Sequence, residues 1–144
     1  MAITATVSNE FKYEKGKGNV DFSSDTFKCI LMAPGFTFDK DVHGTYSDVS
    51  GEEISSTGGY TVGGQTLSTD SAWAQDNTND KGSISWSDES FAASGADMDT
   101  FCAAIMYDDS HGSDVIVGCI DLGADVTIPD GESFQLRNLS FDSE

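Results

Sequence analysis

Apolar residues form two near-continuous runs late in the chain, DTFCAAIMYDD at residues 99–109 and SDVIVGCIDLG at residues 113–123. Only the turn sequence DSHG joins them. A strand that is apolar at both alternating sets of positions is covered on both faces of its sheet, so the runs predict two central strands. A third run, DTFKCILMA at residues 25–33, ends at Pro34-Gly35 and predicts another core strand.

The start of the chain combines an alternating pattern with a helical one. Residues 3–7, ITATV, place alternate apolar side chains on one face, which predicts a strand. Ser8 or Asn9 can then cap a short helical turn through residues 11–15, which one of the following glycines ends.

The middle of the chain is rich in turn residues. GFTFD at residues 35–39 predicts a short strand, and DVSGEEISS at residues 48–56 predicts a brief helix that its glycine weakens. Two glycine pairs, Gly58-Gly59 and Gly63-Gly64, then flank Tyr60. Paired glycines are typical of tight turns and bulges.

The remaining segments read as hairpins. QTLSTDSAWAQD at residues 65–76 and GSISWSD at residues 82–88 flank the turn NTND, and residues 125–141 contain two alternating segments around Pro129-Asp130-Gly131. We count roughly seven to nine strands with a turn signal about every ten residues. The sequence therefore predicts an all-β fold, an antiparallel β-sandwich (jelly-roll-like) with at most one or two short helices, in a single domain spanning residues 1–144.

The negative charge of the chain is unevenly distributed. The net charge is −18, yet residues 1–40 hold five lysines against five acids, and residues 41–144 hold 20 acids against Lys81 and Arg137. Such a surface repels phosphate backbones and anionic membranes, so we expect no nucleic-acid and no membrane partner. The near-neutral segment 1–20 is the predicted partner contact, with these residues: Ile3, Val7, Phe11, Lys12, Tyr13, Lys15 and Lys17. Alternatively, the negative charge only keeps the protein soluble.

The three cysteines, Cys29, Cys102 and Cys119, cannot all pair within one chain. The N-terminal sequence lacks a basic region followed by an apolar run, so we expect synthesis in the cytoplasm and three buried thiols. A bond between Cys102 and Cys119, on neighbouring predicted strands, is the alternative.

The stretch FDKDVHGTYSDVSGEE at residues 38–53 resembles a calcium loop in its spacing. With Asp39 at position 1 of an EF-hand loop, Asp41 and Gly44 fall at positions 3 and 6. His43, however, occupies a position that needs an oxygen ligand, and Ser50 stands where the bidentate glutamate belongs. The pattern excludes an EF-hand and leaves other ions open.

Other candidate chemistry is sparse. The acidic stretch DNTNDKG at residues 76–82 fits a hairpin turn better than a calcium site, because Asn and Asp bond their own backbone in turns. Ser110 and His111 are neighbours in sequence, which does not bring a catalytic triad together in space. Metalloprotease, phosphate-loop and CxxC motifs are absent from the sequence. We therefore predict a protein that is not an enzyme and has no catalytic residues, metal or cofactor.

The segments HGTYSDV at residues 43–49 and GYTVGGQTL at residues 59–67 resemble a family of small virion proteins of tailed bacteriophages, which carry His-x-x-Tyr-x-Asp-Val followed by Gly-Tyr-Thr-x-Gly-Gly-x-x-Leu. The pattern extends to the sequences NEFK, DTFKCILM, AAIMYDD and GCIDLG and to the region of Trp86. The cysteines depart from it, because such proteins more often carry Ala, Val or Tyr there. For the second motif a structural role is favoured, with glycines at positive φ and Tyr60 packed on a sheet edge.

This resemblance implies a structural role in the virus particle and brings no catalytic residues. The expected function is that of a capsid decoration (cement) protein, which binds the outer surface of a phage head and stabilises it. The expected partners are the major capsid protein and further copies of the chain, in a homo-oligomer on the virion. The alternatives are a tail or neck component, or a carbohydrate- or ion-binding β-sandwich module that uses Trp73, Tyr60 or Trp86 as sugar platforms.

Overall fold

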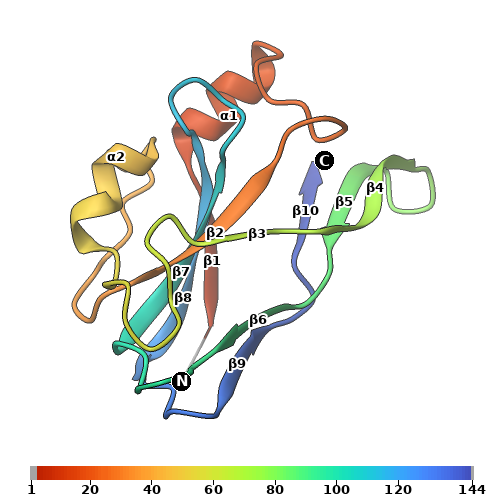
Figure 1. Cartoon of the computed structure of the whole chain (residues 1–144). Helices are drawn as coiled ribbons and strands as arrows, with labels where there is room; N and C mark the ends of the chain where they lie inside the picture. Colours follow the sequence, from red (N-terminus) through yellow and green to blue (C-terminus); the bar gives the residue numbers. More distant parts are fainter. Residues whose placement is uncertain (1–2, 144) are drawn as a thin grey trace.

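The computed structural model describes residues 3–143, which form ten strands in three antiparallel sheets (Figure 1). The five-stranded sheet contains, in spatial order, β1 (Thr4–Val7), β8 (Ile116–Val126), β7 (Phe101–Asp108), β2 (Phe27–Met32) and β3 (Gln65–Thr66). The three-stranded sheet contains β10 (Ser140–Ser143), β5 (Lys81–Trp86) and β4 (Thr69–Asp76), and the two-stranded sheet contains β6 (Glu89–Ala92) and β9 (Ser133–Leu136). The helical elements are α1 (Asn9–Gly16), α2 (Tyr46–Val49) and the 3-10 turn η1 (Ser50–Glu52).

The central strands of the large sheet are buried on both faces, as their apolar runs predict. In β2, Cys29 and Leu31 point into one cluster of buried side chains, and Ile30 and Met32 point into another. Figure 1 shows the reason, because α2 lies on one side of the large sheet and the smaller sheets lie on the other. The fold is therefore an all-β antiparallel sandwich with two short helices, as predicted.

An aromatic cluster joins α1 to the smaller sheets. The ring of Phe11 lies 5.2 Å from that of Phe141 in β10, and Phe22 stacks on Trp73 of β4 at 5.0 Å. Such pairs stabilise a fold by about 0.5–1.5 kcal/mol each beyond the area they bury. The cluster fixes α1 over the opening between the five-stranded and three-stranded sheets.

Two of the predicted elements differ in the structure. Residues 35–39 do not form a strand, because Phe36 packs into the cluster on the outer face of the large sheet and its amide closes a turn onto Ala33. The turn at residues 129–131 is not flanked by the two new strands that were predicted. The long strand β8 ends before it at Val126, and two strands, β9 and β10, follow it. These last strands pair with β6 and β5 and not with each other.

Candidate functional site

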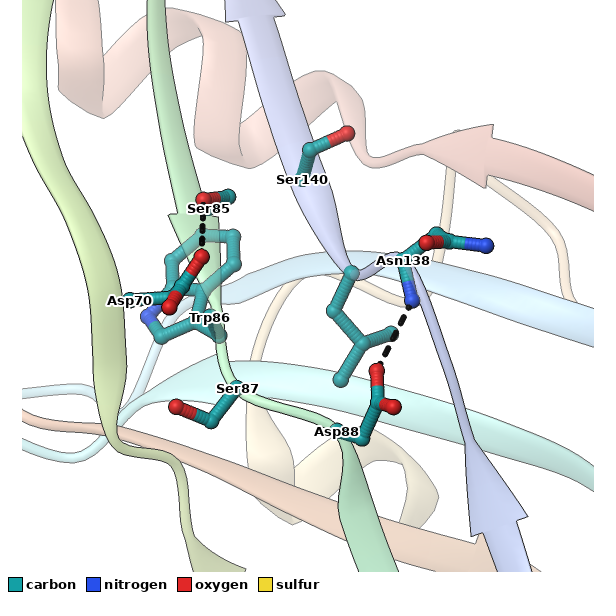
Figure 2. Close-up of a pocket in the computed structure, with 8 residues that line it drawn as sticks. Asp70, Ser85, Trp86, Ser87, Asp88, Asn138 and Ser140 are labelled. Carbon is teal, nitrogen blue, oxygen red and sulfur yellow. Dashed lines mark hydrogen bonds between the residues drawn. The ribbon is translucent and has the colours of Figure 1, made fainter.

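A cleft of about 520 Å³ opens between the β4–β5 hairpin and β10 (Figure 2). Its rim is polar: Ser85 donates to Asp70 over 3.5 Å, and the amide of Asn138 donates to Asp88 over 3.3 Å. Its lining residues include no histidine, cysteine or basic side chain. The cleft therefore offers hydroxyl groups and the two carboxylates of Asp70 and Asp88.

The aromatic residues proposed as sugar platforms pack against other side chains of the fold. Tyr60 and Trp86 are each only 3% exposed. The half-buried ring of Trp73 stacks on Phe22, and the ammonium of Lys15 lies 5.7 Å from its centroid. A sugar platform needs a free aromatic face, which the buried rings of Tyr60 and Trp86 do not offer, and Phe22 covers one face of Trp73.

Helix α1 carries most of the predicted contact residues, and Ser8 sets where it begins. The Ser8 hydroxyl accepts the amide of Phe11 at 3.5 Å, and its own amide donates to Val117 of β8 at 3.0 Å. The cap therefore ties the helix to the large sheet, with Phe11 and Glu14 on its buried side.

The structure separates the predicted contact residues into two groups. Phe11 is 0% exposed and cannot contact a partner in this conformation, which corrects its place in the predicted set. Val7 is half-buried against the core, and Lys15 is half-buried with its ammonium 3.2 Å from the Ser143 hydroxyl. Four of the predicted residues remain exposed: Ile3, Lys12, Tyr13 and Lys17.

The exposed side of α1 adjoins the loop after residue 38, which sequence reasoning did not include. Tyr13 is 61% exposed and Val42 is 64% exposed, and both line a cleft of about 530 Å³ together with Lys40. The ammonium of Lys17 lies 4.8 Å from the Tyr13 ring centroid and holds the ring by a cation–π contact. We call Lys12, Tyr13, Lys17 and Val42 the α1 surface. The only sequence signal that could have added Val42 to this surface was an apolar residue within a polar loop.

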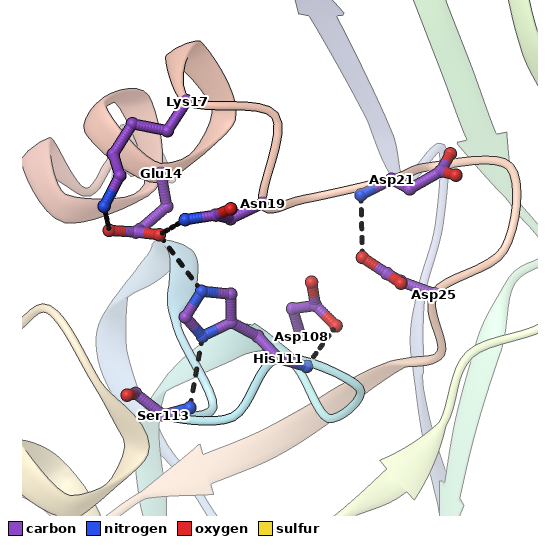
Figure 3. Close-up of polar contacts among 8 residues, drawn as sticks. All are labelled: Glu14, Lys17, Asn19, Asp21, Asp25, Asp108, His111 and Ser113. Atoms are coloured by element: carbon purple, nitrogen blue, oxygen red, sulfur yellow. Dashed lines mark hydrogen bonds and ion pairs between the residues drawn. The ribbon is translucent and has the colours of Figure 1, made fainter.

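A polar cluster lies beneath α1 and joins it to the turn between β7 and β8 (Figure 3). Glu14 accepts bonds from Asn19 at 2.5 Å and from His111 Nε2 at 3.2 Å. The bond from Asn19, followed by those from His111 and Lys17, lowers the pKa of Glu14. His111 Nδ1 accepts the amide of Ser113 at 3.1 Å, so the ring proton lies on Nε2 and is directed at the glutamate. The ion-paired glutamate thus anchors the helix.

The turn residues Ser110 and His111 do not form a catalytic pair. The Ser110 hydroxyl accepts the amide of Thr26 at 2.8 Å. Both nitrogens of the His111 ring are occupied, one by Glu14 and the other by the Ser113 amide. A nucleophilic serine would need one of these nitrogens as its base.

Asp108 ends β7 inside the protein. It is 0% exposed, and its Oδ1 accepts the amides of Ser110 and His111, at 2.9 and 3.2 Å. Its other oxygen, Oδ2, is buried without a hydrogen-bond partner. Burial, followed by the neighbouring carboxyl of Asp25, raises the pKa of Asp108 to about 7.

The acidic loop that resembles a calcium site uses its carboxylates for turns and caps. Asp39 Oδ1 accepts the amide of Asp41 at 2.9 Å, and His43 Nδ1 accepts the amide of Asp39 at 3.0 Å. Asp48 accepts the amides of Gly44 and Thr45 at the start of α2, at 3.1 and 2.9 Å. These amide bonds lower the pKa of Asp48, with that of Thr45 contributing most.

The two motifs that resemble virion proteins meet at one carboxylate. Glu53 Oε2 accepts the Tyr46 hydroxyl at 2.5 Å, while Oε1 accepts the Tyr60 hydroxyl at 2.6 Å and the Gly63 amide at 2.8 Å. Burial is the main cause that raises the pKa of both tyrosines, so they remain neutral donors. The tyrosines come one from each motif. The predicted structural role of the second motif fits this brace, because Tyr60 is buried and its hydroxyl also accepts the amide of Leu31 in β2, beyond the residues that pair with β3.

The three cysteines are free thiols; Cys29 and Cys119 are buried, as predicted, whereas Cys102 is only half-buried. Cys119 faces Ile105 across the β7–β8 ladder and not Cys102. Burial is the main cause that raises the pKa of Cys119 to about 12, and it raises that of Cys29 further. Thiols with such pKa values react slowly, because the thiolate is the reactive form.

Within residues 3–143, no three His, Cys, Asp or Glu side chains are grouped so that they could hold a metal ion. Neither helix in this described part of the chain has the length and apolar character needed to cross a bilayer. Comparisons with protein-family models, with curated proteins and with solved structures found no match to this chain.

Proposed function

We propose that the chain is a non-enzymatic structural protein of a bacteriophage virion, a capsid decoration protein that binds the outer surface of the head and stabilises it. The observation that carries the proposal is the α1 surface. In a chain of net charge −18, it presents two lysines around an exposed tyrosine and an exposed valine. The resemblance of residues 43–49 and 59–67 to virion proteins supports the same class.

The surface has the composition of a small interface centre. Tyrosine is enriched among the residues that dominate binding energy, and apolar area contributes about 25 cal/mol per Å² when buried. Tyr13 is held by Lys17, so little conformational entropy is lost when a partner covers it. Acidic side chains also border the α1 surface, since Glu10, Asp41 and Asp48 line the same cleft as Tyr13 and Val42. The net charge of −18 keeps decorated particles apart.

Stabilisation of the head follows from mass action. A protein that binds only the assembled lattice, with contacts to the major capsid protein and to copies of itself, shifts the equilibrium toward the assembled state. A tail or neck component would occupy few positions on the particle, and a decoration protein would occupy hundreds. Quantitative gels of purified particles distinguish these two by copy number.

Changing Tyr13 to alanine and Lys12 to glutamate together is expected to reduce binding to particles that lack the protein by about tenfold or more. The change removes the apolar centre and reverses one charge of the α1 surface. The urea midpoint should change little, because both side chains are exposed. Binding is measured by co-sedimentation with purified heads across a series of chain concentrations.

Val62→Ser is the matched control, because Val62 is 52% exposed at a site away from α1. This variant should bind as the unchanged protein does. Equal binding of the α1 variant and the Val62 variant would show that α1 is not the contact. Failure of the unchanged chain to bind heads would contradict the decoration function itself.

A further inference from the structure

We propose that Asp25 and Asp108 share one proton and form a pH-sensitive clamp, which holds the segment before β2 against the β7–β8 turn beneath α1. The inference is independent of the proposed function. It begins with an unusual feature of the core, a fully buried aspartate whose Oδ2 has no partner among the described residues. A buried carboxylate oxygen left unpaired destabilises a fold, because it has lost its hydrogen bonds to water and gained none in the protein.

Figure 3 shows the side chains of Asp25 and Asp108 in the same cluster, and after burial the Asp25 carboxyl is the group that raises the pKa of Asp108 most. Asp25 Oδ2 already accepts the amide of Asp21 at 2.7 Å, which fixes its orientation. Two charged carboxylates this close repel each other, and burial increases the repulsion. A single proton removes this repulsion. When Asp108 is protonated, its Oδ2 can donate to Asp25 and is no longer without a partner.

A proton fits the pair better than a metal ion. Calcium takes about six to eight oxygen ligands and magnesium demands a near-octahedral set. Within residues 3–143, Asp25 and Asp108 are not part of any group of three His, Cys, Asp or Glu side chains that could hold a metal ion. The amides around Asp108 are donors, which a cation does not bind.

The clamp is surrounded by charged groups that are already paired. From α1, Glu14 is bonded to His111 and to Lys17. From β2 and the turn, Lys28 lies 3.6 Å from Asp109. Asp21 faces the pair only through its backbone amide, because its carboxylate accepts from Ser23 and Ser24. None of these groups supplies a bond to Asp108 Oδ2.

The clamp is connected to α1 through the turn it fixes. Asp108 Oδ1 holds the amide of His111, whose ring donates to Glu14 on the buried side of the helix. The amide of Asp109 also donates to Thr26 at 2.9 Å. Loss of the shared proton therefore weakens the contact between α1 and the β7–β8 turn. The contact of the N-terminal cap with β8 remains.

The sign of the pH dependence follows from which state holds the proton. An unfolded aspartate releases its proton near its ordinary pKa of about 3.9, whereas native Asp108 retains it up to about pH 7. In this window the native state binds one more proton, so its stability falls as pH rises, by up to about tenfold in the unfolding constant per pH unit. Above pH 7 the contribution is lost and the dependence ends.

Urea unfolding of the full chain between pH 5 and 8.5, compared with Asp108→Asn, tests the clamp. The asparagine mimics the protonated acid: its oxygen accepts the two amides and its NH₂ donates to Asp25. Between pH 5 and 7 we expect the unfolding constant of the unchanged chain to rise on the order of a hundredfold relative to the variant. At pH 8 the variant should have the higher urea midpoint. The two proteins differ only at residue 108, so the difference between their pH dependences reports the loss of the Asp108 carboxyl.

Asp125→Asn is the control, since it removes the same charge from an exposed site on β8 and should retain the full pH dependence. An equal dependence in the Asp108 variant would overturn the clamp. So would a rise in the midpoint of the unchanged chain at pH 8 on adding CaCl₂ or MgCl₂, because the pair would then hold a cation. If Asp108→Asn does not fold, Asp25→Asn replaces it in the urea experiment, and the carbon-13 titration of the Asp108 carboxyl is measured in the unchanged chain. An Asp108 carboxyl that titrates near its ordinary value contradicts the proposal.

Discussion

Replacing Gly64 with alanine is expected to destabilise the domain by about 4 kcal/mol or more, a large part of the about 5–15 kcal/mol that holds a typical domain folded. A Cβ at this position would lie 2.0 Å from the carbonyl oxygen of Cys29 and 2.8 Å from Cγ2 of Ile30. The oxygen belongs to the backbone of the central strand β2 and cannot move without breaking the ladder. Circular dichroism during urea unfolding measures the loss.

The neighbouring glycine provides the matched control. Gly63 has a φ of +98° and Gly64 a φ of +79°, so alanine is strained at both positions. At Gly63, however, an added Cβ meets nothing within 4 Å. We expect Gly63→Ala to destabilise by about 1–3 kcal/mol, from backbone strain alone. Equal effects at the two positions would show that strain, and not the approach to Cys29, determines the need for glycine.

The pattern of apolar residues was sufficient to predict the two-sided core. The runs containing β2, β7 and β8 are apolar at both alternating sets of positions. Both sets are largely buried in β2, in β7 and in the first part of β8, whereas Asp121 and Gly123 of β8 are exposed. The strand predicted for residues 35–39 was wrong. Alternation of apolar and polar residues indicates which side chains are buried, but not which backbone groups form hydrogen bonds. Phe36 is buried by packing onto the face of the sheet from a loop.

The candidate surface was only partly visible in the sequence. Lys12, Tyr13 and Lys17 were predicted and are exposed, but Phe11 was predicted with them and lies in the core. Helical spacing could have separated them, since Phe11 and Glu14 are three residues apart on one side of α1. The approach of Val42 depends on how a loop folds back over about thirty residues, which local pattern does not encode.

Contacts between distant polar residues were the least predictable part. Asp108 and Asp25 are separated by most of the chain, and only the antiparallel pairing of β2 with β7 brings their ends together. In the sequence, Glu53 is only the last acid of the stretch that resembles a calcium loop. It is instead the acceptor that joins the two motifs, and a charged residue in a run of acids gave no sign of this.

Replacing Glu53 with alanine is expected to destabilise the domain by about 3 kcal/mol or more, because each buried donor left without a partner contributes about 1–3 kcal/mol. Three donors lose their acceptor: the hydroxyls of Tyr46 and Tyr60 and the amide of Gly63. Tyr60 also accepts the amide of Leu31 in β2, so its displacement would disturb the central strand. Urea unfolding followed by tyrosine and tryptophan fluorescence measures the change.

Two further substitutions test whether the effect comes from the Glu53 carboxylate itself. Glu52→Ala removes the preceding, exposed side chain and should change the midpoint little, since Glu52 contributes its backbone carbonyl to Ala33. Glu53→Gln retains an oxygen for Tyr60 and Gly63 but turns an NH₂ toward Tyr46, which predicts an intermediate loss of about 1 kcal/mol. If Glu53→Ala were as stable as Glu52→Ala, the tyrosines would have other acceptors and the two motifs would not depend on this carboxylate. The expected order, with alanine at 53 least stable, would instead show that the motif tyrosines serve to fasten the α2 segment to the sheet.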